Sequence, residues 1–117
     1  MELEGKVGIV TGSAKGLGKA IALKLAKEGC AIVASDIDKD GASEVIKEIH
    51  SFGQDGIPVK ADVSKKSDVE AMVKEAVLKY GHIDILVNNA GICYLTPIID
   101  ITEEEWDRVM AINLKGT

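Results

Sequence analysis

Three glycines near the N-terminus have the types and spacing needed to hold a phosphate-containing ligand. Gly12, Gly16 and Gly18 lie between a short apolar run and a helical pattern that begins at Leu17. Glycine allows backbone torsions and close approaches that a Cβ would block, and Gly18 would let the helix pack tightly on its strand. Unpaired N–H groups at the start of a helix attract an anion such as a pyrophosphate. The segment Thr11–Gly18 therefore predicts dinucleotide binding.

The glycine spacing differs from two familiar nucleotide-binding motifs. It reads G-x-x-x-G-x-G, whereas the general dinucleotide fingerprint is G-x-G-x-x-G. A mononucleotide P-loop is excluded, because Ser13 stands where its first glycine belongs and Ala20 where Mg²⁺ would need a hydroxyl. The alternative is a glycine-rich turn that binds nothing, but these glycines would then cost helix or strand stability without a compensating use.

A carboxylate is predicted at the end of the second strand. Asp36 follows Gly18 by eighteen residues, where a dinucleotide fold places the carboxylate that binds the adenosine ribose. It would repel a 2′-phosphate, and the neighbouring Ile37 has no charge to offset this, so we expect NAD rather than NADP. Lys15 favours the opposite, because a basic side chain in the glycine turn could pair with a 2′-phosphate. A turn or N-cap role for Asp36 is also open, although Asp38 could fill it.

Two more segments are predicted at the same edge of the sheet, where ligands collect in such folds. Asp62 and Val63 follow the third strand, and the Asp62 carboxylate could accept the amino group of an adenine. The alternative is a simple turn capped by Asp62 or Ser64. The other segment ends the fourth strand and consists of Asn88, Asn89, Ala90 and Gly91. Its asparagine side chains can hydrogen-bond the loop internally, while its small residues leave room for a cofactor.

Asn113 interrupts an apolar pattern near the end of the sequence. Trp106, Val109 and Met110 share its predicted helical face, so an amide stands where an apolar residue is expected. A buried amide without partners costs on the order of 1–3 kcal/mol. Asn113 therefore either ends the apolar stripe near a frayed terminus or has a specific polar role.

Strands and helices alternate along the chain, which predicts βαβ crossovers and a parallel α/β sheet. The expected strands are residues 6–10, 31–35, 57–61 and 83–87. Pro58 near the start of the third strand suits a position at the edge of the sheet. The first helix is expected over residues 17–28.

The later helices are predicted from apolar spacing and capping patterns. The second helix carries one apolar face, formed by Ala42, Val45, Ile46 and Ile49. The third begins with a Ser67–Glu70 capping box, ends at Gly81 and has an apolar face formed by Val69, Met72, Val73, Ala76, Val77 and Tyr80. The last opens with a second capping box, Thr102 and Glu105.

Composition limits the range of partners. The 117 residues suffice for one domain, with 46% apolar and 3% aromatic residues. A net charge of −5 without a basic stripe argues against nucleic acid and anionic membranes as partners. No secretory signal, membrane span or metal site is predicted. Cys30 and Cys93 are expected to be free thiols in a reducing cytoplasm.

Taken together, these residues resemble the short-chain dehydrogenase/reductase family. Thr11–Gly18 matches its T-G-x-x-x-G-x-G cofactor motif, and Asp62-Val63 resembles the pair that holds the adenine. Asn88–Gly91 is similar to its N-N-A-G motif, which stabilises the central sheet and lines the cofactor site. Asn113 is similar to the Asn that kinks the following helix and holds a water of the proton relay. The resemblance implies a Rossmann-type doubly wound parallel sheet, incomplete here, with strand order 3-2-1-4 and helices on both faces.

The resemblance also implies the roles of individual residues over one domain, residues 1–117. Asn113 is expected to be catalytic. Cofactor contacts are expected from Thr11, Gly12, Ser13, Lys15, Gly16, Leu17, Gly18, Asp36, Ile37, Asp62, Val63, Asn89, Ala90 and Gly91.

By resemblance, the parent protein is expected to be an NAD(H)-dependent oxidoreductase that moves a hydride between nicotinamide and an alcohol or carbonyl substrate. The catalytic Ser and Tyr-x-x-x-Lys pair of the family are absent, and neither Tyr80 nor Tyr94 has a Lys four residues later. We therefore expect a piece of a longer protein that is inactive alone, with its fourth strand as an exposed apolar edge. A homodimeric or homotetrameric parent is implied, with the helix near Thr102 at its interface.

Two alternatives to the enzyme reading remain at this point. One is a dinucleotide-binding or regulatory module without redox chemistry, and the other is a structural domain that binds nothing. A downstream Tyr-x-x-x-Lys would favour the enzyme. The substrate cannot be predicted, because Cys93, Tyr94 and Leu95 alone do not define a pocket.

Overall fold

One parallel sheet forms the centre of the molecule. The computed structural model describes residues 2–92 and 100–117. The strands lie in the order β3-β2-β1-β4, which confirms the order predicted by resemblance. All three strand pairs are parallel, so the strands end at one side of the sheet, the carboxyl edge, and begin at the other, the amino edge. The strands are β1 (Val7–Thr11), β2 (Ala31–Asp36), β3 (Gly56–Lys60) and β4 (Ile85–Val87).

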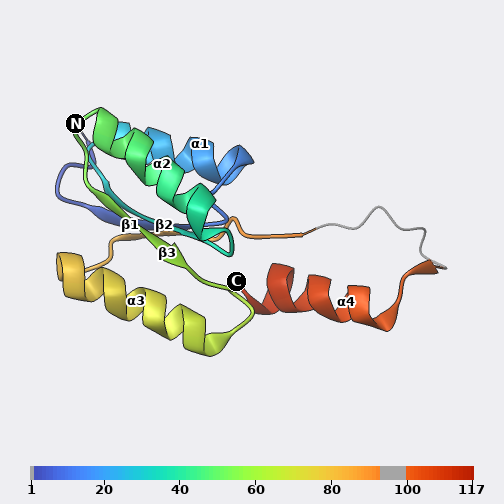
Figure 1. Ribbon diagram of the computed structural model, residues 1–117. Coiled ribbons are helices and arrows are strands. Elements are labelled where there is room, and N and C mark those ends of the chain that lie inside the picture. The colour runs from blue at the N-terminus through green and yellow to red at the C-terminus, as the bar shows by residue number, and fades with distance from the viewer. Residues whose placement is uncertain (1, 93–99) are drawn as a thin grey trace.

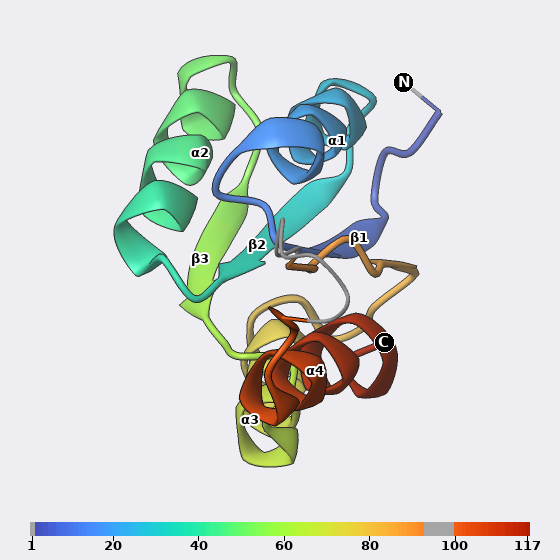
Figure 2. The ribbon, with the colours of Figure 1, turned by 90° about the vertical axis from the view of Figure 1, so that its right-hand side faces the viewer.

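Helices cover both faces of this sheet. The helices α1 and α2 lie on one face and α3 lies on the other, while α4 lies beyond the carboxyl edge on the side of α3 (Figures 1 and 2). None of the helices in the described ranges has the length and apolar character of a membrane span. The helices are α1 (Gly16–Lys27), α2 (Lys39–Ser51), α3 (Lys66–Tyr80), α4 (Glu103–Met110) and the π-helical turn η2 (Ala111–Lys115).

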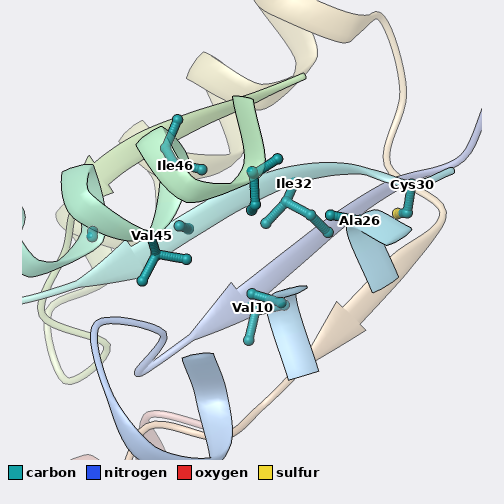
Figure 3. Packing of buried hydrophobic residues seen from close by; sticks show 10 residues of the cluster. Val10, Ala26, Cys30, Ile32, Val45 and Ile46 are labelled. Carbon is teal, nitrogen blue, oxygen red and sulfur yellow. The ribbon is translucent and has the colours of Figure 1, made fainter. Parts of the chain in front are cut away.

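The face covered by α1 and α2 is closely packed. Val10 and Ile32 of the sheet contact Ala26 of α1 and Val45 and Ile46 of α2 in one buried cluster (Figure 3). The apolar face predicted for the second helix is confirmed, because all of its members are buried. Burial of this apolar surface fixes α1 over β1 and β2, and α2 over β2 and β3.

The opposite face is covered only in part by the described residues. Met72 and Ala76 of α3 are buried against the sheet. On the same predicted face, the side chains of Val73 and Val77 are 40% and 44% exposed. On β4, the outermost strand, Leu86 is 54% exposed. The predicted apolar face of the third helix is therefore only half correct, whereas the predicted exposure of the fourth strand is confirmed.

The two predicted capping boxes had different outcomes. Thr102 caps α4, and its Oγ1 accepts a hydrogen bond from the Glu105 N–H at 3.1 Å. The Ser67 cap is wrong, because α3 already begins at Lys66 and its N-cap residue makes no side-chain cap bond. Asp68 of this first turn instead accepts a hydrogen bond from the Asp62 N–H at 2.9 Å, so the turn is tied to the loop after β3.

The strand boundaries differ slightly from the predictions. The first strand begins and ends one residue later than predicted, and the third begins and ends one residue earlier. The fourth is shorter and starts at Ile85 rather than at residue 83. Pro58 lies on an edge strand as predicted, because β3 is the outermost strand on its side.

Candidate functional site

The glycine turn between β1 and α1 has the backbone geometry that its sequence predicts. Gly12 and Gly16 have positive φ angles of 64° and 61°, a conformation in which L side chains are strained. A Cβ at Gly12 would lie 2.9 Å from Cα of Ala90, and one at Gly18 would collide with the Gly12 carbonyl oxygen. Gly18 therefore packs α1 against the turn itself, more closely than any other residue type would allow.

The start of α1 is open toward an anion. The first turn of the helix contains no acidic residue, and its N-cap, Lys15, makes no side-chain cap bond. The N–H groups of the first helical turn have no partners within the helix and carry its partial positive charge. Lys15, Gly16 and Leu17 are exposed beside them. This end of the helix can accept a pyrophosphate.

Thr11 joins the glycine turn to the loop after β4. Its Oγ1 accepts hydrogen bonds from the N–H groups of Asn89 at 3.0 Å and Ala90 at 3.1 Å, and donates to the Val87 carbonyl at 3.3 Å. The Asn89 side chain donates to the Gly12 carbonyl at 3.1 Å. The N-N-A-G loop was predicted to bond internally, but these hydrogen bonds join it to the glycine turn instead and fix the two loops relative to each other.

Ser13 lies inside the turn rather than on its surface. It is fully buried, and both its N–H and its hydroxyl donate to the Ser35 carbonyl at 3.2 Å. This placement ties the turn to the end of β2. The geometry gives no support to the predicted cofactor contact of the Ser13 side chain.

Asp36 orders the backbone around it. Its Oδ2 accepts from the Ala14 N–H and its Oδ1 from the Asp38 N–H, both at 3.0 Å. The N-cap of α2 is Asp38, whose side chain accepts from the Gly41 N–H, so the N-cap role considered for Asp36 belongs to its neighbour. Each carboxylate oxygen of Asp36 can still accept a further hydrogen bond from a ligand hydroxyl.

Asp62 forms a turn and keeps part of its carboxylate free. Its Oδ1 accepts hydrogen bonds from both the N–H and the hydroxyl of Ser64, as the simple-turn alternative predicted. The Ser64 hydroxyl is the main cause that holds the pKa of Asp62 below its usual range, with smaller contributions from the charges of Lys65 and Arg108. Its Oδ2 has no hydrogen-bond partner among residues 2–92 and 100–117. A ligand amino group could therefore bind there.

A small pocket of about 90 Å³ lies where these loops meet. It is smaller than the 300–1,000 Å³ of typical ligand pockets, so it could enclose only a small part of a dinucleotide. Its lining joins the ends of β1, β2 and β3 to the loop after β4 and to α4. The lining residues are Gly12, Asp36, Ile37, Ala61, Asp62, Val63, Ala90, Gly91, Ile92, Arg108 and Ile112.

Seven of the predicted cofactor residues share this pocket: Gly12, Asp36, Ile37, Asp62, Val63, Ala90 and Gly91. The predicted residues outside its lining are Thr11, Ser13, Lys15, Gly16, Leu17, Gly18 and Asn89. Sequence reasoning missed four lining residues, Ala61, Ile92, Arg108 and Ile112. The last two could not be found because no local pattern indicates that the end of the chain returns to the carboxyl edge. No three His, Cys, Asp or Glu side chains in the described ranges lie close enough to hold a metal ion.

Asn113 has a specific polar role. Its Oδ1 accepts from the Ile92 N–H at 2.8 Å, and its Nδ2 donates to the Ile92 carbonyl at 2.7 Å. It lies in the π-helical turn η2, where the α-helical ladder is interrupted. The apolar stripe is only partly covered, because Val109 and Met110 are half-buried while Trp106 is 58% exposed and Asn113 is exposed as well. Asn113 therefore ties the end of the last helix to the loop beside the pocket.

Tyr80, the one tyrosine in the described ranges, supplies no proton donor at the carboxyl edge. Tyr80 lies at the amino edge, where it lines a second pocket with Asp55 and His82. Burial is the main cause that raises the pKa of its phenol above the ordinary value, and the Asp55 charge adds to it. Tyr94 lies outside the described residues. The site can therefore hold a ligand, but no tyrosine of the described ranges lies beside it.

Comparisons with known proteins agree with this geometry. A family model described as short chain dehydrogenase matches residues 6–117. The chain is 42% identical over 116 residues to a 3-oxoacyl-(acyl-carrier-protein) reductase of Thermotoga maritima, covering 99% of this chain and 47% of the relative. It is 46% identical over 112 residues to a diacetyl reductase, (S)-acetoin forming, of Staphylococcus epidermidis, covering 96% of this chain and 44% of the relative.

A solved structure has the same fold. The 3-ketoacyl-(acyl-carrier-protein) reductase of Brucella melitensis, in complex with NADH, matches with a TM-score of 0.92 and 43% identity, over 97% of this chain and 46% of that one. This chain thus spans about half the length of the relatives it matches. From the family model and these relatives, we conclude that the chain belongs to the short-chain dehydrogenase family.

Proposed function

We propose that this chain is the cofactor-binding half of an NAD(H)-dependent oxidoreductase that acts on an alcohol or carbonyl substrate. The observation that carries the proposal is the convergence of Gly12, Asp36 and Asp62 on one pocket beside the start of α1. A bound nicotinamide would supply or accept the hydride, while this half of the protein binds and orients the cofactor.

Each loop of the carboxyl edge contributes one part of the proposed binding site. The N–H groups at the start of α1 bind the pyrophosphate. Asp36 accepts hydrogen bonds from the ribose hydroxyls, and Asp62 accepts one from the amino group of the adenine. Ile37 and Val63 supply apolar surface for the base. The reductase of Brucella melitensis, whose structure was solved in complex with NADH, supports this class of ligand.

The proposed cofactor is NAD rather than NADP. Asp36 lines the pocket with its charge already oriented by two backbone N–H groups, and Ile37 beside it has no positive charge. A 2′-phosphate would meet that carboxylate at close range. Lys15 is exposed and outside the pocket lining, so it is the weaker influence on this choice.

The chain by itself is proposed to bind cofactor without turnover, because its sequence contains no Tyr-x-x-x-Lys pair. This same observation favours a second candidate, a dinucleotide-binding module without redox chemistry.

The whole protein is proposed to be a cytoplasmic homo-oligomer. Its proposed partner is a small molecule rather than nucleic acid or membrane, in keeping with the net charge of −5.

Thermal shift and a turnover assay with NAD test this proposal. NAD at saturating concentration should raise the melting temperature of the 117-residue chain. The chain should reduce no detectable NAD with a panel of alcohols. Absence of any NAD-dependent stabilisation would contradict the proposed binding, and turnover by the chain alone would contradict the proposed division of labour. A Tyr-x-x-x-Lys in a longer reading frame would favour the enzyme over the binding module.

The choice of NAD can be tested by Asp36→Asn. This substitution removes the charge but keeps one oxygen acceptor for the surrounding backbone. The ratio of NADP to NAD affinity, measured by calorimetry, should rise about tenfold, the value expected for loss of one charged interaction of about 1.4 kcal/mol. Asp40→Asn, which removes an acidic charge from the first turn of α2, is the matched control and should leave the ratio unchanged. An unchanged ratio in Asp36→Asn would mean that Asp36 serves the turn alone.

A further inference from the structure

Three consecutive residues after β3 form one wall of the pocket at the carboxyl edge. Ala61, Asp62 and Val63 all belong to its lining. The Ala61 N–H still donates to the Asp36 carbonyl of β2 at 3.1 Å, but the paired part of β3 ends just before it, at Lys60. Because β3 is the outermost strand on its side, no further strand of the described sheet can hold the residues that follow. The rest of the wall therefore needs partners outside the sheet.

Asp68 of α3 supplies the partner for the next backbone group. Its Oδ2 accepts a hydrogen bond from the Asp62 N–H at 2.9 Å. The Asp62 carbonyl accepts one from the Lys65 N–H, also at 2.9 Å, so Asp62–Lys65 is a closed turn whose first residue is held by Asp68. A hydrogen bond to an ionised carboxylate is stronger than one between neutral groups.

The place of Asp68 on its helix favours this bond. Asp68 is half-buried, and it is the one acidic residue in the first turn of α3. The N-cap residue, Lys65, makes no side-chain cap bond, so the partial positive charge of the helix start favours the Asp68 carboxylate. Within the described ranges, no other side chain of α3 makes a hydrogen bond to a residue of the pocket lining. Asp68 thus joins α3 to the wall.

We propose that Asp68 is a positioning residue for the cofactor site: its hydrogen bond to the Asp62 N–H holds the loop after β3 in the conformation that binds the ligand. A loop that is ordered only on binding lowers affinity, and a loop that is fixed beforehand avoids this cost. Asp68 does not line the pocket, so it acts through the loop rather than on the ligand. This inference rests on the proposed function, because the ligand is the dinucleotide proposed for that pocket.

Asp68→Ala and Asp68→Asn test this inference as a pair. Both substitutions remove the charge from the first turn of α3, but Asn keeps an oxygen that can accept the Asp62 N–H. The NAD affinity of the 117-residue chain, measured by calorimetry, should fall about fivefold in Asp68→Ala and stay within about twofold of the original in Asp68→Asn. Hydrogen exchange of the Asp62 amide, followed by NMR without ligand, should become about tenfold faster in Asp68→Ala and change little in Asp68→Asn.

Glu70→Ala is the matched control on the same helix. Glu70 is exposed, and its carboxylate lies 3.8 Å from the Lys66 ammonium rather than at the loop. Its removal should leave both the NAD affinity and the exchange of the Asp62 amide unchanged. A general loss of stability in α3 would act on this control as well, whereas loss of the hydrogen bond would not.

A folded Asp68→Ala chain with the original NAD affinity would overturn the inference. An equal loss of affinity in Asp68→Ala and Asp68→Asn would also overturn it, because the charge rather than the hydrogen bond would then be responsible. If Asp68→Ala does not fold, the unmodified chain decides: an Asp62 amide protected about tenfold or more supports the inference, and one that exchanges as in an unstructured chain overturns it. If the unmodified chain does not bind NAD, the proposed function fails and the inference with it.

Discussion

The carboxyl edge and the amino edge of the sheet are both hollowed, but they differ in chemistry. The pocket at the amino edge has a volume of about 450 Å³, against about 90 Å³ at the carboxyl edge. The helices α1, α2 and α3 begin near the carboxyl edge and end near the amino edge (Figure 1). Partial positive charge therefore gathers at the smaller pocket and partial negative charge at the larger one.

The charged side chains do not follow this division, because each pocket is lined by two carboxylates and one Lys or Arg. The amino-edge pocket lies beside the ends of helices, whose partial negative charge makes it a poor environment for a pyrophosphate. The carboxyl edge has the left-handed glycines and an unneutralised helix start. The chemistry of the loops at the carboxyl edge therefore identifies the candidate site, although the pocket at the amino edge has the larger volume.

The largest expected effect is from Gly18→Ala at the carboxyl edge. The new Cβ would collide with the Gly12 carbonyl and press on the Asn89 side chain, so the turn or the helix must shift. We expect a loss of about 2–3 kcal/mol in the free energy of unfolding, measured by urea denaturation, together with loss of NAD binding.

Gly53→Ala is the matched control at the amino edge. Gly53 also has a positive φ, of 87°, but a Cβ there would meet no atom within 4 Å. It should cost about 1 kcal/mol and leave NAD affinity unchanged. Equal effects of the two substitutions on NAD binding would remove the distinction between the edges.

A smaller effect is expected from Asn113→Leu. The substitution leaves the N–H and carbonyl of Ile92 without their partners, which should cost about 1–2 kcal/mol in the free energy of unfolding. NAD affinity should fall severalfold, because the loop beside the pocket is released. Leu114→Ala, at an exposed neighbour, should change stability by less than about 0.5 kcal/mol. If Asn113→Leu made the chain more stable, Asn113 would only end the apolar stripe of the last helix and would have no specific polar role.

The smallest effect is expected at the amino edge, from Tyr80→Phe. The folded chain holds the phenol proton more tightly than the unfolded chain, since burial raises the pKa of Tyr80 above its ordinary 10.0. The resulting stability is complete below pH 10 and is lost as the pH rises above it. Between pH 9.5 and 11 the melting temperature of the original chain should fall about 3 °C more than that of Tyr80→Phe. Identical pH profiles, or a change in NAD affinity at pH 7, would contradict this assignment.

The sequence predicted the carboxyl edge better than the surroundings of the site. The strand order follows from the resemblance, and Asp36 and Asp62 could be placed because residues after parallel strands meet at one edge. Arg108 could not be placed, since its approach to the pocket depends on long-range contacts of η2 with Val63 and Ile92. These contacts have no local periodicity.

Local competition between hydrogen bonds explains two further differences. Ser67 was expected to cap α3, but the helix begins one residue earlier and Asp68 binds the Asp62 N–H instead. The Ser13 hydroxyl donates to the Ser35 carbonyl, so the predicted cofactor contact of this residue stays a prediction. In both cases the sequence shows a polar side chain of the correct type, while its partner is set by tertiary structure.

Incomplete covering of α3 explains why only half of its predicted apolar face is buried. Val73 and Val77 have the helical spacing of core residues, yet the described chain covers them only in part. Periodicity predicts which face of a helix is apolar. It does not say whether the same chain covers that face.

Binding of NAD at the carboxyl edge is tested most directly by an NMR titration of the 117-residue chain with NAD. Backbone amide shifts are followed at both edges of the sheet. We expect saturable shifts at Gly12, Gly16 and Asp62, with none at Gly53 and Asp55 across the sheet. Such a result would locate the dinucleotide at the smaller pocket. Shifts confined to Gly53 and Asp55, or none at saturating NAD, would contradict the account.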